Sequence, residues 1–140
     1  MRVAAIDLGT VRVGLAISDE LGSMAHPRPH LPGGALPPLL EALARLATEE
    51  GIERFLVGLP RRLDGSEGRE ARLARQFAAQ LATRTGVEVT LCDEWLSTRQ
   101  AQQRLHEGGR KVKDSRQRID SAAAAVLLQS WLDGRAAGGG

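Results

Sequence analysis

Residues 4–19 of this chain read AAIDLGTVRVGLAISD. Two apolar runs rich in Val, Ile and Ala flank a Gly-Thr turn, and this pattern predicts strands over residues 2–8 and 12–18. The first run leads directly into a carboxylate, Asp7. Because a buried charge is costly unless it is paired, hydrogen-bonded or bound to a metal ion, the sequence raises the question of what Asp7 meets.

The size and composition of the chain indicate one domain. It has 140 residues, of which 42% are hydrophobic and 3% aromatic, so the core is built from small aliphatic side chains. We expect a single domain over residues 1–135 and a disordered tail over 136–140. No apolar run reaches the roughly 18 residues of a membrane span, and the N-terminus lacks a signal-peptide layout. A single cysteine, Cys92, excludes an internal disulfide and a multi-cysteine zinc site, so we expect a cytoplasmic protein.

Periodicity predicts the remaining elements. The expected strands are 2–8, 12–18, 23–30, 54–58 and 87–92, and the expected helices are 36–50, 67–85, 98–106 and 115–132. Two prolines confine the third strand to a sheet edge, and Gly14 indicates a bulge or a close backbone approach. Leu73, Phe77 and Leu81 are placed on the core face of the second helix.

These elements predict an α/β fold with a mixed five-stranded sheet. Short links join the first three strands, which favours an antiparallel meander, whereas helices link the later strands, which favours parallel pairing. The sheet therefore has three antiparallel strands followed by two parallel ones, with helices on both faces.

Basic residues gather in one part of the chain, although the net charge is only +2. Seven Lys or Arg lie between residues 99 and 118, against two acidic residues, so this segment carries about +5. The seven are Arg99, Arg104, Arg110, Lys111, Lys113, Arg116 and Arg118. Such a segment suits a polyanion handled with metal ions, and a solvated protein surface is the alternative interpretation.

Three carboxylates occupy positions that the predicted topology could bring together. Asp7 ends the first strand, Glu94 follows the fifth, and Asp120 lies early in the last helix, beside alanines that permit close approach to the sheet. Converging carboxylates repel one another unless cations lie between them. Oxygen ligands select Mg²⁺ or Mn²⁺, and two such ions about 4 Å apart can clamp a phosphodiester. Individually, each has a plainer interpretation: a turn cap, a surface acid and a helix N-terminal charge.

Four segments in order resemble one family of nucleases. They are IDLGTVRVGLAISD (6–19), VGLPRRLDGSEGREA (57–71), DEWLSTRQA (93–101) and IDSAAAAVLLQSWL (119–132). Over about residues 1–133 the chain is similar to the YqgF/RuvX family of Holliday junction resolvase-like proteins, also assigned as pre-16S rRNA nucleases. The resemblance implies a ribonuclease H-like fold and a metal-dependent nuclease whose acidic triad is Asp7, Glu94 and Asp120. The family motif points to Glu94 rather than its neighbour Asp93.

The resemblance also suggests which residues hold the nucleic acid. It places Thr10 and Arg12 beside Asp7, with Arg12 as a phosphate contact. Trp95 stands where the family usually has arginine, so a cation near the metal site is missing or supplied elsewhere. Arg61-Arg62 replaces a usually neutral stretch, which adds either phosphate affinity or only surface charge. The predicted nucleic-acid-binding residues are Thr10, Arg12, Arg61, Arg62, Arg104, Arg110, Lys111, Lys113, Arg116 and Arg118.

The expected function is phosphodiester hydrolysis with two metal ions, in 5′-end processing of pre-16S rRNA, because the family's cellular role is linked to it. The alternative substrate is a four-way DNA junction, whose symmetric cleavage favours a two-fold dimer. With the substrate open, we expect either a monomer or a homodimer. A non-catalytic nucleic-acid-binding module is an alternative of another class. An actin-like ATPase, suggested by the sequence IDLGT, needs two related domains where this chain supplies one.

Overall fold

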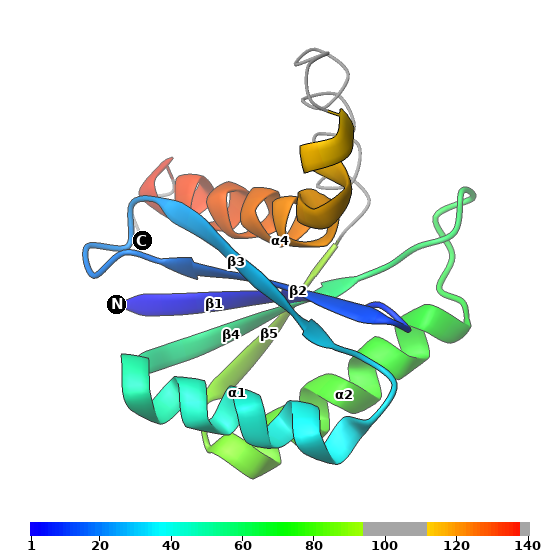
Figure 1. The fold of residues 1–140 in the computed structure, drawn as a ribbon, viewed down its shortest axis with the longest axis horizontal. Helices are drawn as coiled ribbons and strands as arrows, with labels where there is room; N and C mark the ends of the chain where they lie inside the picture. The colour runs from blue at the N-terminus through cyan, green and yellow to red at the C-terminus, as the bar shows by residue number, and fades with distance from the viewer. Residues whose placement is uncertain (94–111, 138–140) are drawn as a thin grey trace.

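The computed structural model describes the backbone of residues 1–93 and 112–137, and the side chains of residues 1–93 and 121–135. The strands are β1 (Arg2–Asp7), β2 (Arg12–Ser18), β3 (Ala25–Pro32), β4 (Ile52–Leu59) and β5 (Glu88–Asp93), and the helices are α1 (Leu36–Glu50), α2 (Arg69–Thr85) and α4 (Val112–Ala137) (Figure 1). The helix predicted over residues 98–106 lies outside the described residues. So do residues 138–140 of the predicted tail, whereas α4 extends through Ala137.

The strands form one five-stranded sheet in the order β3-β2-β1-β4-β5. β3 pairs with β2 and β2 with β1 in antiparallel fashion, whereas β1 pairs with β4 and β4 with β5 in parallel fashion. The predicted mixed sheet is therefore confirmed, as is the edge position of the proline-containing third strand.

The third strand begins two residues later than predicted because an aspartate holds the preceding turn. The Asp19 carboxylate accepts hydrogen bonds from the backbone N–H of Ser23 (2.8 Å) and of Met24 (3.3 Å). These bonds keep residues 19–24 out of the ladder, so β3 starts at Ala25.

A register shift confirms the interpretation of Gly14. In the pairing of β2 with β3, the register moves between Val13 and Leu15, which places an irregularity at the glycine between them. The bulge lies next to the end of β1, since Gly14 is the ladder partner of Asp7.

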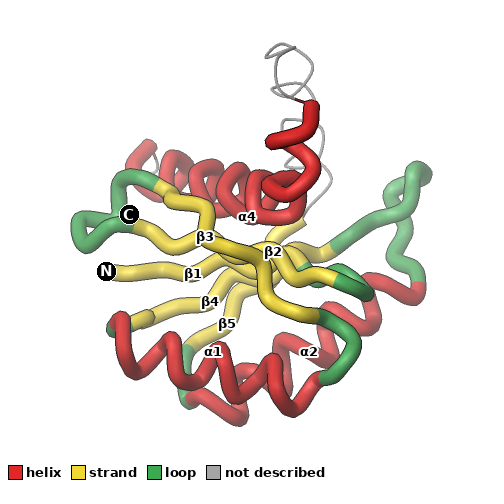
Figure 2. Tube along the Cα trace, viewed as in Figure 1, coloured by secondary structure: helices red, strands yellow, loops and turns green. Residues whose placement is uncertain are grey.

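Two hydrophobic layers lie on opposite faces of the sheet. Figures 1 and 2 show α1 and α2 on one face and α4 on the other, as predicted. Along β1 the side chains alternate between them: Ala4 and Ile6 join the layer under α1 and α2, whereas Val3 and Ala5 join the layer under α4. Because both faces are covered, β1 is apolar and buried from Val3 to Ile6, directly before Asp7.

The two helices on the first face of the sheet, α1 and α2, each end at a glycine. Gly51 and Gly86, both with positive φ, donate their N–H to a carbonyl oxygen in the last turn of their helix.

The core face of α2 differs from the prediction at one residue. Phe77 and Leu81 are buried as predicted, but Leu73 is 49% exposed. The buried stripe of α2 runs through Ala74 and Ala78 instead, so Leu73 lies at its edge.

Within the residues that the structure covers, we find no helix with the length and apolarity needed to cross a lipid bilayer.

Candidate active site at the carboxyl edge of the sheet

The parallel strands bring three strand ends to one edge. Ile6 of β1 pairs with Val57 of β4, and Leu59 at the end of β4 pairs with Asp93 at the end of β5. Since all three strands run in the same direction, Asp7 and Asp93 lie along the same edge of the sheet. This is the edge at which open α/β sheets bind ligands.

Asp7 is half-buried and lies between two glycines. Strand alternation places it on the α4 side of the sheet, two residues after Ala5. Its partner on β2 is Gly14, and Gly58 of β4 follows the pair formed by Ile6 and Val57. Gly58 is two residues after Leu56, which packs on the α4 side, so both glycines share the face of Asp7. The two strand positions directly beside this carboxylate therefore carry no side chain.

The first described side chains of α4 lie toward this edge. The buried Ser121 hydroxyl donates to the carbonyl oxygen of Arg28 (2.5 Å), whose ladder partner Leu15 is one residue from Gly14. At the other end of the helix, the Gln129 amide accepts the N–H of Ala25 (2.9 Å). The helix thus runs across β3 from the Asp7 edge toward the opposite edge, and Ala124, fully buried, allows it to lie close to the sheet. The backbone of residue 120 therefore belongs to the part of α4 nearest the Asp7 edge.

Asp93 differs from Asp7 in the face that it occupies. On β5, Leu91 packs in the layer under α1 and α2, whereas Cys92 packs under α4, so alternation places Asp93 on the side opposite to Asp7. The Asp93 carboxylate accepts a hydrogen bond from Arg61 Nε at 3.1 Å. It is half-exposed and paired with a cation rather than directed toward Asp7.

Arg61 is a cation at this edge whose pairing was not predicted. Besides Asp93, its guanidinium lies 3.7 Å from the Glu67 carboxylate and donates to the carbonyl oxygen of Gly65 (3.3 Å). These contacts attach the loop after β4 to the end of β5. The family resemblance identified Arg61 as a departure from a usually neutral stretch, but the carboxylate that Arg61 meets is 32 residues away.

The same loop is ordered by a second acidic residue. Asp64 accepts hydrogen bonds from the Ser66 hydroxyl (2.6 Å) and N–H (2.9 Å), and these bonds hold the pKa of Asp64 below its ordinary value. Arg62 packs over Gly68, because a Cβ built on that glycine would lie 2.5 Å from Arg62 Nε. Thr10 and Arg12 are exposed in the turn after Asp7 and at the start of β2.

The remaining predicted site residues have side chains outside the described part of the chain. They are Glu94, Arg104, Arg110, Lys111, Lys113, Arg116, Arg118 and Asp120. Among the side chains that the structure covers, no three of the His, Cys, Asp and Glu residues gather closely enough to hold a metal ion. The convergence of Asp7, Glu94 and Asp120 therefore stays a prediction.

The fold defines a class of protein. Over 98% of this chain and 96% of the other, it matches Thermus thermophilus RuvC in complex with a Holliday junction substrate (TM-score 0.62, 18% identity). It also matches a fowlpox virus resolvase solved with Holliday junction DNA, over 96% of this chain and 98% of that chain (TM-score 0.56, 13% identity). The protein thus has the ribonuclease H-like fold that these resolvases share.

Within that class, the chain belongs to the family described as "RuvX: Holliday junction resolvase", whose model matches residues 1–134. Curated relatives carry the name "Putative pre-16S rRNA nuclease". One from Anaeromyxobacter sp. (strain Fw109-5) is 45% identical over 96% of this chain and 98% of its own length. One from Myxococcus xanthus is 42% identical over 95% of this chain and 88% of its own length. One from Lactococcus lactis is 37% identical over 96% of this chain and 96% of its own length. The predicted family and fold are confirmed.

Proposed function

We propose that the protein is a metal-dependent nuclease that hydrolyses phosphodiester bonds in the 5′-end processing of pre-16S rRNA. The observation that carries this proposal is the half-buried Asp7, which ends a buried strand between Gly14 and Gly58 on a fold shared with nucleases. The names of relatives that match nearly the whole chain support ribosomal RNA as the substrate.

The proposed metal ligands are the carboxylates of Asp7, Glu94 and Asp120. Carboxylate oxygens are the donors that Mg²⁺ and Mn²⁺ prefer, and the positions directly beside Asp7 on the two neighbouring strands are glycines. Two bound ions would supply stabilisation of the charge that develops on the phosphate. Asp93 lies on the opposite face and pairs with Arg61, which supports the assignment of its neighbour Glu94 as the ligand.

The protein's own cations would hold the sugar–phosphate backbone. Thr10 and Arg12 follow Asp7 in the chain, and Arg61 and Arg62 lie in the loop after β4. Arg61, held by Asp93 at the carboxyl edge, supplies a cation there although Trp95 replaces the family's arginine. Arg104, Arg110, Lys111, Lys113, Arg116 and Arg118 complete the proposed set of nucleic-acid-binding residues. Contacts of this kind bind any sequence and weaken as salt rises.

A four-way DNA junction is the second candidate substrate. The description of the family and the fold shared with the Thermus thermophilus and fowlpox virus resolvases favour it. A resolvase must cut two strands symmetrically, which favours a two-fold dimer, whereas trimming of RNA can be performed by a monomer. A nucleic-acid-binding module without catalysis is the alternative of another class.

Cleavage assays with an isosteric variant test the proposal. We would incubate end-labelled single-stranded RNA, duplex RNA and a four-way DNA junction with Mg²⁺, Mn²⁺ or EDTA. The proposal expects metal-dependent cleavage of RNA by the wild type, and a loss of at least about 100-fold in Asp7→Asn with binding largely retained. Asp133→Asn is the matched control, since it makes the same chemical change at an exposed position on α4.

Each other outcome selects a rival. Preferential cutting of the junction, together with a dimer in sedimentation, would assign the protein as a resolvase. Binding of all three substrates without cutting, unchanged in Asp7→Asn, would leave only the binding module.

A further inference from the structure

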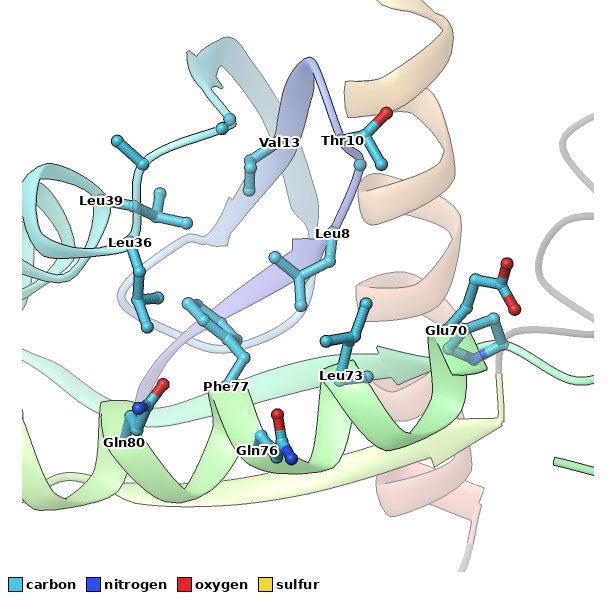
Figure 3. A pocket seen from close by; sticks show the side chains of 16 residues that line it. Leu8, Thr10, Val13, Leu36, Leu39, Glu70, Leu73, Gln76, Phe77 and Gln80 are labelled. Atoms are coloured by element: carbon cyan, nitrogen blue, oxygen red, sulfur yellow. The ribbon is translucent and has the colours of Figure 1, made fainter. Parts of the chain in front are cut away.

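A pocket lies under the turn that follows Asp7, on the face opposite to α4 (Figure 3). Its volume is about 510 Å³, within the range of small-ligand sites. The walls are apolar and come from three parts of the chain. They are formed by Leu8 and Val13 beside the β1–β2 turn, by Leu36 and Leu39 of α1, and by Leu73 and Phe77 of α2.

Backbone contacts hold the β1–β2 turn, which covers this pocket, against the segment that precedes α1. The Gly33 N–H donates to the carbonyl oxygen of Val11 (2.8 Å). A Cβ on Gly33 would lie 2.9 Å from the carbonyl oxygens of Gly9 and Thr10, and one on Gly9 would lie 2.2 Å from that of Arg12. The two glycines thus permit a close packing of the turn against the segment before α1, so the pocket is preformed.

The polar groups at the rim select the kind of ligand. Glu70, Gln76 and Gln80 of α2 line the pocket together with Thr10, and no Lys or Arg is among the lining residues that the structure describes. A phosphate is therefore disfavoured, since the one charged side chain is acidic. The apolar walls can cover the ring faces of a nucleobase, and the rim groups can bind its edges, because carboxylates and carboxamides accept hydrogen bonds and carboxamides also donate them.

The pocket and the proposed active site share one turn. Leu8 packs on the α1 and α2 side of the sheet directly after Asp7, which faces α4. A strand whose phosphate lies at the Asp7 edge can therefore direct a neighbouring base past Thr10 into the pocket. Leu73 gains a role in this arrangement, because a base would cover a leucine that is otherwise 49% exposed.

Resting on the proposed nuclease function, we propose that this pocket binds one unpaired base of the RNA strand next to the phosphate that is cut. A base in a paired duplex cannot enter it without leaving its stack, so the pocket favours single-stranded RNA over duplex. The pocket would thereby set the position of cleavage relative to an unpaired nucleotide.

An abasic scan tests this proposal. RNA binding is measured by fluorescence anisotropy in the Asp7→Asn background with Mg²⁺, using one single-stranded RNA with an abasic site at each position in turn. We expect about a tenfold loss of affinity at one position. Leu73→Gln should bind the intact RNA about tenfold more weakly and show no further loss at that position. Leu63→Gln is the matched control, since Leu63 is 90% exposed and does not line the pocket.

The outcomes separate this proposal from the nuclease proposal. If Leu73→Gln keeps the full abasic sensitivity, the pocket does not hold a base and the proposal is overturned, whatever the cleavage assay shows. If Leu73→Gln alters only the sedimentation of the protein, the pocket holds a second copy and the proposal is likewise overturned. Abasic sensitivity that depends on Leu73 in a protein that cuts no RNA would support the pocket while the nuclease proposal fails.

Discussion

At the scale of single residues, the carboxylate at the end of β1 is notable for what its neighbours lack. Gly14 of β2 pairs with Asp7, and Gly58 of β4 follows the pair formed by Ile6 and Val57, so the two positions directly beside Asp7 carry no side chain. In a sheet covered on both faces, adjacent strands would otherwise carry aliphatic side chains at these positions. The glycines are therefore best explained as room for a ligand or for the helix above.

A substitution at Gly58 separates these two explanations. If the room serves a metal ion and a phosphate, Gly58→Ala should lower the cleavage rate by about tenfold or more and raise the Mn²⁺ concentration needed for half-maximal rate. The measurement is a metal titration of the cleavage rate together with a thermal melt.

Gly134→Ala is the control, because a Cβ on that helical glycine has no neighbour within 4 Å and should leave cleavage unchanged. A Gly58→Ala protein that loses stability while keeping its metal dependence would show that the glycine serves helix packing alone.

At the scale of elements, one acidic residue connects three of them. Glu50 at the end of α1 accepts two hydrogen bonds from Arg28 of β3 (2.6 and 3.0 Å) and lies 3.3 Å from Arg2 of β1. The hydrogen bonds and charge of Arg28, followed by the charge of Arg2, hold the pKa of Glu50 below its ordinary value. The edge strand β3 is thereby fastened to the helix on the first face.

The lowered pKa of Glu50 predicts a pH dependence with a definite sign. The folded carboxyl binds protons less readily than the unfolded one. Its stabilising effect is therefore fully present above the ordinary glutamate pKa of about 4.3 and is lost as the pH falls through the lower folded value. We expect Glu50→Gln to lower the free energy of unfolding by about 1 kcal/mol at pH 7, and the difference from wild type to shrink in acid.

Urea denaturation at pH 7 and at pH 3 provides the measurement. Glu41→Gln is the control, because the pair of Glu41 with Arg84 is far more exposed and should contribute little at either pH. A Glu50→Gln difference that is equally large at both pH values would contradict the electrostatic explanation.

Much of the secondary structure, but not all of it, could be predicted from the sequence. Strand and helix types, their order and the edge position of β3 followed from apolar periodicity, prolines and glycines, because these signals are local. The start of β3 and the exposure of Leu73 could not be predicted from these local signals. The first depends on the Asp19 carboxylate capping Ser23 and Met24, and the second depends on which stripe of α2 meets the sheet. Both are decided by contacts that no spacing encodes.

At the scale of the whole molecule, some features of the site could be predicted from local sequence, and others depend on how the strands are arranged. Asp7 could be singled out because a charge ends an apolar run, which is a local contradiction in the sequence. The pairing of Arg61 with Asp93 could not, since it depends on the order of β4 and β5 in the sheet. The predicted strand ends suggest that Asp7, Glu94 and Asp120 converge, and the family resemblance implies that they form the acidic triad. This convergence stays a prediction, because two of the three side chains lie outside the described residues.

The distribution of cations over the molecule makes a final prediction about salt. Arg61 and Arg62 lie in the loop after β4 at the carboxyl edge, whereas the exposed Arg45 and Arg84 lie on α1 and near the end of α2. Each phosphate contact on a single strand contributes about −0.7 to the slope of log K against log salt. The double variant Arg61→Ala/Arg62→Ala should therefore reduce the magnitude of that slope by about 1.4 for single-stranded RNA. Arg45→Ala/Arg84→Ala removes the same charge elsewhere and should leave the slope unchanged, so equal effects of the two variants would show that net charge, not a located binding edge, attracts the RNA.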